Sequence, residues 1–167
     1  MMTLSERLLA EFDQEMTTSR RAIERVPTGM GEWKPHPKSF SLGHLTQLVS
    51  TMPGWIARTL REPEMNIAGG AGYSYQKTES LLEQFDKLTN DAHDAFVNTT
   101  DAALDEMWSL KMGDQNLFTL PRYVAVRQHI NHFCHHRGQL TVYLRLIDIP
   151  VPSLYGPTAD ESWTSPK

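Results

Sequence analysis

Apolar residues recur every three or four positions along four stretches of the chain, the spacing that places side chains on one face of an α-helix. The first stretch starts with Thr3 and Glu6, a pair typical of the capping box at a helix N-terminus. Its apolar stripe consists of Leu4, Leu8, Phe12, Met16, Ile23 and Val26. Because Pro27 and Gly29 follow, we expect this first helix to end near Val26.

A second helix is expected to begin near Ser41, with Ser39 or Ser41 available as its N-terminal cap. Pro53 removes a backbone donor and is followed by Gly54, so the sequence predicts a kink, with residues 55–60 continuing as a second helical piece. Residues 63–77 carry several glycines and predict a loop. Its length indicates a crossover connection rather than a tight turn.

Ser80 and Glu83 predict another capping box, at the start of a third helix that fades near Thr99. Residues 100–120 show a mixed pattern that predicts short turns and gives no basis for a sheet. Pro121 is typical of the first turn of a helix, and the apolar pattern then continues to residue 146. We therefore expect a fourth helix over residues 121–146.

The residues after the fourth helix, 150–167, contain four prolines and predict an extended tail that packs across the bundle through Leu154 and Tyr155. Four long amphipathic helices with one long crossover predict an all-α four-helix bundle. A chain of 167 residues fits one hydrophobic core, so residues 1–167 are expected to form a single domain.

Composition narrows the classes of partner. The formal net charge of −4 disfavours a nucleic-acid partner, because such proteins usually carry clustered Lys and Arg. No apolar run is long enough to span a bilayer and the N-terminus lacks a signal-peptide core, so neither membrane insertion nor export is expected. The single cysteine, Cys134, cannot form an intramolecular disulfide, which favours a cytoplasmic location.

Histidines are concentrated in the fourth predicted helix, where four of the chain's seven lie between positions 129 and 136. His132 and His136 are one turn apart, and His129 lies on the same face. Two imidazoles at this spacing can chelate one divalent ion. Cys134 points nearly the opposite way, so it is interpreted as a packed thiol rather than a ligand. A chance pair of surface or core histidines is the competing interpretation, and the spacing alone leaves both open.

A third ligand would have to come from elsewhere in the fold. His44 is the natural candidate, because it lies among apolar residues of the second helix, where an unpaired imidazole is costly. The alternative is that His44 is an ordinary core or boundary histidine. His129 is a second candidate for the same role. His36 and His93 are expected to be solvated.

Three stretches carry a likeness to a known family: residues 33–39 (WKPHPKS), 131–139 (NHFCHHRGQ) and 152–161 (PSLYGPTADE). In their order and separation the sequence resembles the DinB-like superfamily, also called the YfiT-like metal-dependent hydrolase fold. The resemblance implies a four-helix bundle that is commonly a homodimer. It also implies that one histidine of the second helix, together with His132 and His136, holds nickel, zinc or a similar ion with water in the open positions.

The sequence departs from the family pattern at one position. In the relatives it resembles, the second-helix histidine stands where this chain has Leu48, and His44 lies one turn earlier. Three arrangements are therefore open: His44 reaches the ion from a shifted register, His129 substitutes for it, or the site is degenerate and keeps only His132 and His136.

The first functional hypothesis is a metal-dependent enzyme, either a hydrolase or a thiol-dependent transferase, that acts on a small molecule. The second is a non-catalytic bundle, a scaffold or stress-related binding protein with a degenerate metal site. Gln139 and Tyr143 extend the histidine face and are expected to hydrogen-bond a metal ligand or substrate. Arg137 either binds a substrate carboxylate or forms a structural ion pair, and we favour the structural role.

Overall fold

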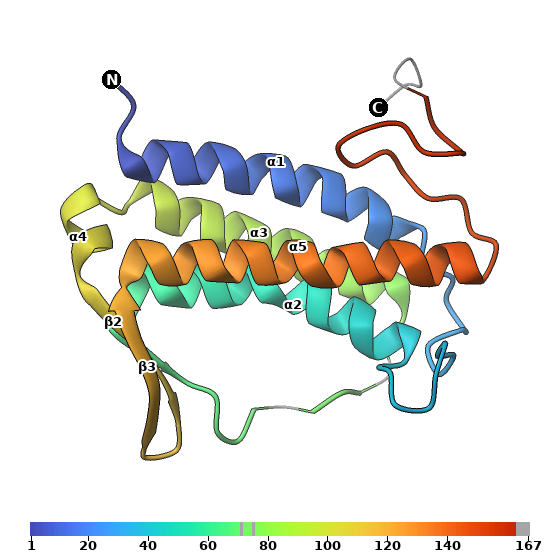
Figure 1. Cartoon of the computed structure of the whole chain (residues 1–167), viewed down its shortest axis with the longest axis horizontal. Helices are drawn as coiled ribbons and strands as arrows, with labels where there is room; N and C mark the ends of the chain where they lie inside the picture. Colours follow the sequence, from blue (N-terminus) through green and yellow to red (C-terminus); the bar gives the residue numbers. More distant parts are fainter. Residues whose placement is uncertain (71, 75, 163–167) are drawn as a thin grey trace.

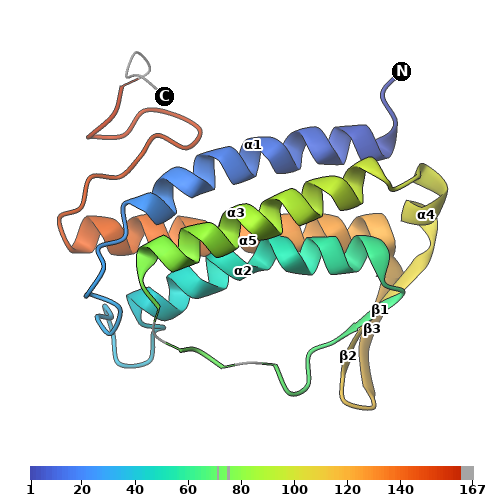
Figure 2. The same ribbon diagram turned by 180° about the vertical axis from the view of Figure 1, so that it is seen from behind.

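Four long helices form the body of the molecule. The computed structural model describes residues 1–70, 72–74 and 76–162. The long helices are α1 (Leu4–Glu24), α2 (Leu42–Arg61), α3 (Thr78–Val97) and α5 (Arg122–Leu146), and a five-residue helix, α4 (Asp101–Asp105), follows α3. Helices α1 and α2 each pack against both α3 and α5, which gives a four-helix bundle (Figures 1 and 2).

The predicted start of α1 is confirmed in detail. The Thr3 side chain accepts a hydrogen bond from the Glu6 backbone N–H, and the Glu6 carboxylate accepts one from the Thr3 backbone N–H at 2.8 Å. This capping box satisfies two donors that the first turn of a helix otherwise leaves unpaired. The apolar stripe behind it is buried, with Phe12 and Ile23 fully inaccessible to solvent.

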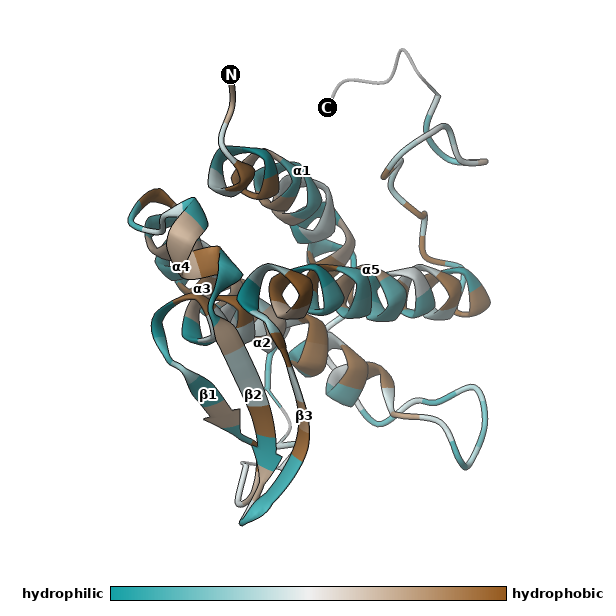
Figure 3. Cartoon of the chain, turned by 60° about the vertical axis from the view of Figure 1, so that its left-hand side comes forward, coloured by the Kyte–Doolittle hydropathy of each residue, from teal (hydrophilic) through white to brown (hydrophobic). Residues whose placement is uncertain are grey.

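The expectation of an all-α fold was wrong, because a small sheet lies at one end of the bundle (Figure 3). Its strands are β1 (Glu64–Asn66), β2 (Met107–Met112) and β3 (Gln115–Pro121), in the order β1-β2-β3. Strand β1 pairs with β2 in parallel, and β2 with β3 as an antiparallel hairpin with an irregularity between Leu110 and Lys111. The described chain is therefore mainly helical with a three-stranded sheet.

The sheet is attached to the bundle by a small apolar cluster. Trp108 on β2 is fully buried and packs with Met65 of β1 and Ala125 of α5. Trp55 of α2 packs against this cluster and against the main core as well. The ends of α2 and α5 are consequently fixed to the sheet, next to the histidine-rich part of α5.

Helix α2 continues through Pro53 as one helix, where the sequence predicted a kink between two helical pieces. Its axis changes direction part-way along its length (Figure 1), as a proline inside a helix usually causes. A Cβ atom on Gly54 would lie 3.0 Å from the Leu88 side chain, so the missing side chain permits close packing of α2 on α3.

Helix α3 begins before the predicted capping box. Its first residue is Thr78 and its N-cap is Lys77, which makes no side-chain capping bond, so the pairing of Ser80 with Glu83 was wrong. The Thr78 hydroxyl instead donates to the Val26 carbonyl at 2.9 Å. This bond joins the start of α3 to the end of α1, a tertiary contact that short-range sequence patterns do not contain.

The C-terminal tail folds back onto the bundle and is fastened there by ion pairs (Figure 1). Glu161 accepts from Arg21 at 2.5 Å and from Arg25 at 2.6 Å, and Asp160 is paired with Arg145. The Tyr155 hydroxyl hydrogen-bonds Arg137 and Glu15, and the Arg137 guanidinium lies 5.0 Å from the centroid of its ring. Within the described ranges, none of the helices is both long enough and apolar enough to cross a membrane.

Candidate functional site

His132 and His136 face each other on α5 as the i, i+4 spacing predicts. Their Nε2 atoms lie 2.8 Å apart, and Nδ1 of His136 lies 2.8 Å from Oε1 of Gln139. A carboxamide oxygen only accepts hydrogen bonds, so Nδ1 of His136 carries a proton and its Nε2 has a free lone pair. Nε2 of His132 therefore donates to Nε2 of His136. Two ring nitrogens are thus directed at one point.

Both imidazoles are held in the neutral form. Burial lowers the pKa of His132, and the neighbouring His136 and His135 lower it further. Burial also lowers the pKa of His136, against the hydrogen bond that its Nδ1 donates to Gln139, which raises the pKa. Neutral imidazole is the form that binds a metal ion, because the lone pair is then available. The environment therefore favours the state in which this pair can act as ligands.

Aromatic side chains enclose the pair on the side of α2. The Trp55 ring centroid lies 6.0 Å from that of His132, and the Phe40 ring lies 6.4 Å from that of His136. Trp55 also lines a cavity of about 540 Å³ between α2, the crossover segment and Gln84 of α3. The histidine pair and the cavity therefore share the Trp55 side chain as a common wall.

His44 lies on the α2 side of this cavity but not as the third member of a histidine triad. Its ring packs against Phe40 at 4.3 Å and stacks on Tyr73 at 5.1 Å. Leu48 follows one turn later and lines the same cavity. The aromatic stacking gives His44 a packing role. This role resembles that of an ordinary boundary histidine, the alternative considered from the sequence.

His129 is turned towards the sheet. It is 9% exposed, and its ring meets Trp108 edge-on at 5.8 Å and Trp55 at 6.2 Å. Its Nε2 atom is buried and has no hydrogen-bond partner within the described residues. Burial lowers the pKa of His129 to about 4, with a smaller contribution from His132. His129 is therefore neutral at physiological pH and has one unused ring nitrogen.

In residues 1–70, 72–74 and 76–162, no three side chains of His, Cys, Asp or Glu come together as a metal-binding group. The structure brings together His132, His136 and Gln139, and it places His44 and His129 in separate aromatic surroundings. The metal-binding role of all four histidines stays a prediction. The structure thus contains a preorganised pair, His132 and His136, and His44 and His129 remain the two candidates for a third ligand.

Lowering the pH is expected to destabilise the metal-free protein through His129. Its pKa in the folded state is about 4, against 6.5 for an unperturbed histidine. The unfolded chain therefore binds a proton that the folded chain does not, and stability is lost as the pH falls from about 6.5 to about 4. We expect His129 to account for a loss of about 3 kcal/mol in the free energy of unfolding.

Urea unfolding of chelator-treated protein at about pH 7 and about pH 4.5 measures most of this loss, which is complete only below about pH 4. His129→Leu is expected to show a smaller decrease than the wild type, because leucine takes up no proton. His36→Leu, at an exposed position, is the matched control and should follow the wild type. An equal decrease in wild type and His129→Leu would contradict the assignment.

The remaining side chains of interest serve other purposes. Tyr143 donates from its hydroxyl to the Phe40 carbonyl at 3.3 Å, and its ring meets Trp33 edge-on at 5.7 Å. It thus ties α5 to the segment before α2. Nδ1 of His93 lies 3.0 Å from Oδ1 of Asp13, and His36 is exposed. Trp55 and Phe40, which form the walls around the pair, were not singled out from the sequence, because large apolar residues at helical spacing first indicate core packing.

Arg137 is a buried structural cation. It is 1% exposed and donates to Glu15 Oε2 at 2.5 Å, to Ser19 at 3.0 Å and to the Tyr155 hydroxyl at 2.5 Å. Tyr155 in turn donates to Glu15 at 2.8 Å. The structural role favoured from the sequence therefore agrees with its position. Glu15 was missed, and the signal for it was an acidic residue within an apolar helical stripe.

Cys134 belongs to the same cluster. Its thiol donates to Glu15 Oε2 at 3.3 Å, and its sulfur lies 3.7 Å from the Tyr155 hydroxyl oxygen. Burial raises the pKa of the Cys134 thiol, so it stays protonated near neutral pH. Positions 132 and 134 of a helix point about 200° apart. Helix α5 therefore carries the histidine pair on one side. On its other side, Cys134 and Arg137 meet Glu15 of α1 and Tyr155 of the tail.

Comparisons with known proteins agree with this architecture. A family model described as the DinB family matches residues 1–166. The DinB-like protein YjoA from Bacillus subtilis is 17% identical with a TM-score of 0.70, and the match covers 89% of this chain and 96% of that one. A DinB-like protein from Bacillus cereus is 21% identical with a TM-score of 0.70, covering 89% and 95%. Among curated proteins, none matches the sequence.

Proposed function

Because this chain belongs to the DinB family, we propose that it is a metal-dependent enzyme of the hydrolase or thiol-dependent transferase type. In this proposal His132 and His136 hold a divalent ion, nickel or zinc. The observation that carries it is the pair of neutral imidazoles whose Nε2 atoms meet 2.8 Å apart. An ion in place of the shared proton would satisfy both nitrogens.

The donor set fits a divalent ion of borderline softness, because imidazole is a common ligand of zinc and nickel. When bound, such an ion supplies Lewis acidity that favours the deprotonated form of water or a thiol near neutral pH. Gln139 fixes the His136 tautomer with Nε2 unprotonated. This is the supporting hydrogen bond that metal-ligating histidines usually make through their second nitrogen.

Substrate binding is assigned to the cavity beside the pair. Trp55 and Leu48 offer apolar surface there, and Gln84 offers a carboxamide whose oxygen has no partner within the described residues. Arg58, also on the wall, is already paired with Glu62 at 2.9 Å. The Trp55 ring, which lines the cavity, has its centroid 6.0 Å from that of the His132 ring.

Elemental mass spectrometry on untagged protein, purified without chelator and after addition of zinc or nickel, tests the proposal. We expect about one ion per chain in the wild type, and its loss in His132→Ala and in His136→Ala. His135→Ala is the matched control, because His135 is an exposed neighbour on the same helix. Loss of the ion in His44→Ala or in His129→Ala would identify the third ligand.

A specific observation favours a second candidate function. In the family pattern that this sequence resembles, the second-helix histidine stands where this chain has Leu48, and the described residues contain no cluster of three ligands. A non-catalytic DinB-like bundle with a degenerate site is consistent with both facts. Wild-type protein that holds no zinc or nickel after either metal is added would reject the enzyme proposal and leave this one.

A further inference from the structure

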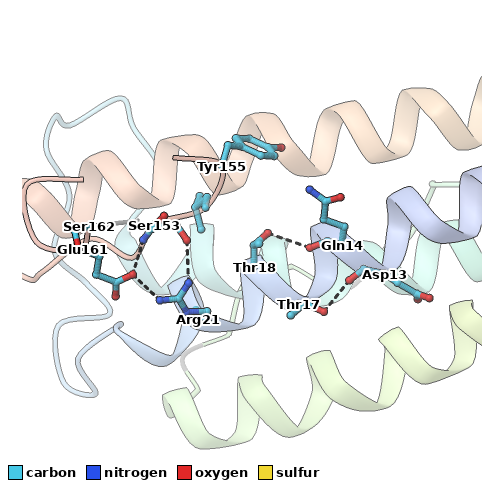
Figure 4. A pocket seen from close by; sticks show the side chains of 10 residues that line it. Asp13, Gln14, Thr17, Thr18, Arg21, Ser153, Tyr155, Glu161 and Ser162 are labelled. Atoms are coloured by element: carbon cyan, nitrogen blue, oxygen red, sulfur yellow. Dashed lines mark hydrogen bonds and ion pairs between the residues drawn. The ribbon is translucent and has the colours of Figure 1, made fainter. Parts of the chain in front are cut away.

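A second cavity of about 540 Å³ lies on the other side of α5 from the histidine pair, between α1 and the C-terminal tail. Its walls come from one face of α1 and from residues 153–155 and 161–162 of the tail. Figure 4 shows Gln14 and Thr18 pointing from α1 towards the tail, with Tyr155 on the opposite wall. We propose that this cavity binds an uncharged aromatic molecule that carries an amide or hydroxyl group.

The cavity is preformed, because an ion pair and hydrogen bonds hold the tail residues of its wall in place. Arg21 donates to the Ser153 carbonyl at 2.9 Å and to Glu161 at 2.5 Å, as Figure 4 shows. The Ser153 backbone N–H also donates to Glu161, at 2.8 Å. A ligand therefore need not order the tail when it binds, and preorganisation of this kind increases affinity.

The charged groups around the cavity already have partners, which selects against ions. Arg21 and Glu161 form an ion pair, and the Asp13 carboxylate accepts a hydrogen bond from Nδ1 of His93 at 3.0 Å. A charged ligand would have to break one of these pairs or enter a partly enclosed space without a counter-ion, and both are unfavourable. An uncharged ligand has neither penalty.

The polar groups of the walls select for hydrogen-bond donors. The Thr17 hydroxyl donates to the Asp13 carbonyl at 2.8 Å, and the Thr18 hydroxyl donates to the Glu15 carbonyl at 3.1 Å. Both hydroxyl protons are thus directed at the helix backbone, and the Thr17 oxygen remains as an acceptor. The Thr18 oxygen already accepts from Arg137 at 3.1 Å and keeps one further lone pair. Gln14 adds an exposed carboxamide that can donate and accept. A ligand amide or hydroxyl matches this set.

The aromatic requirement comes from Tyr155. The Arg137 guanidinium lies 5.0 Å from the Tyr155 ring centroid and covers one face, yet the residue is 61% exposed. The other face of the ring is therefore open, with Leu154 beside it on the cavity wall. A flat ring stacked there would bury apolar surface on both partners.

Three probes with the same ring and different charge test the proposal: benzamide, benzoate and benzylamine. Saturation-transfer NMR titrations with chelator-treated protein keep the result independent of any metal. We expect benzamide to bind with a millimolar Kd, as suits its size, and about tenfold more tightly than either ion. No benzamide binding, or equally tight binding of benzoate or benzylamine, would overturn the proposal.

Variants assign the site. Gln14→Trp fills the cavity from an exposed position and is expected to weaken benzamide binding by at least about tenfold, and Gln14→Leu by roughly threefold. Gln128→Trp, at an exposed glutamine that lines neither cavity, is the matched control and should bind like the wild type. Binding that survives Gln14→Trp but is lost in Trp55→Ala would place the ligand in the cavity beside α2 and refute the assignment.

Discussion

Glu15→Ala is expected to lower the free energy of unfolding by about 3–5 kcal/mol, because it leaves the buried Arg137 guanidinium without its counter-ion. Glu15 is 7% exposed and Arg137 is 1% exposed, so water cannot take the place of the lost carboxylate. The same substitution removes the acceptor of the Tyr155 hydroxyl and of the Cys134 thiol. Chemical denaturation followed by circular dichroism measures the change.

Glu11→Ala is the matched control for this experiment. Glu11 lies one turn earlier on α1 and pairs with Arg127 of α5 at 2.5 Å, so it too bridges α1 and α5. Its carboxylate and the guanidinium are 34% and 47% exposed, and such pairs contribute less than about 1 kcal/mol. Similar losses for Glu11→Ala and Glu15→Ala would mean that burial of the Arg137 pair does not determine its contribution.

Arg122→Ala is expected to lower the free energy of unfolding by about 3 kcal/mol or more, because it removes a charged donor shared by several buried carbonyls. The Arg122 side chain donates to Thr59 O at 2.8 Å, to Glu62 O at 2.7 Å and to Ala103 O at 3.0 Å. These bonds satisfy the last carbonyls of α2 and connect them to α4. Thermal and urea unfolding measure the loss.

Arg61→Ala tests whether any arginine at the end of α2 has this effect. Arg61 is exposed and pairs with Asp91 at 2.6 Å, so its removal is expected to change stability by less than about 1 kcal/mol. Arg122→Lys adds a second comparison, because lysine keeps the charge but not the planar set of donors. A lysine variant as stable as the wild type would show that charge alone is sufficient.

The four long helices followed from the sequence because each buries one continuous stripe, and a stripe is visible without any partner. The β2–β3 hairpin could not be predicted in this way. In β2 only Trp108 is fully buried, and the irregularity at Leu110 and Lys111 interrupts the alternation that signals a strand. Strand β1 is three residues long and pairs with residues more than forty positions away. Pairing of that kind is set by tertiary contacts rather than by local pattern.

In the candidate site, too, some contacts follow from local helix geometry and others depend on distant parts of the chain. The facing of His132 and His136 follows from helix geometry alone. The surroundings of His44 do not, because they depend on Tyr73 from the crossover and on Phe40 from the segment before α2. The partner of Arg137 comes from Glu15, on a helix at the other end of the chain. A single sequence indicates that an acid is unusual within an apolar stripe, but it does not indicate which base it meets.

The two sides of α5 also matter for protein engineering. His132 and Gln139 are exposed, and their contacts lie within their own helix or on the Trp55 ring, so a library varied at these positions explores new chemistry on an intact scaffold. Cys134 and Arg137 touch α1 and the tail, and variation there alters the scaffold itself. Selection for a new activity and selection for heat tolerance can thus proceed on opposite sides of one helix, with little interference between them.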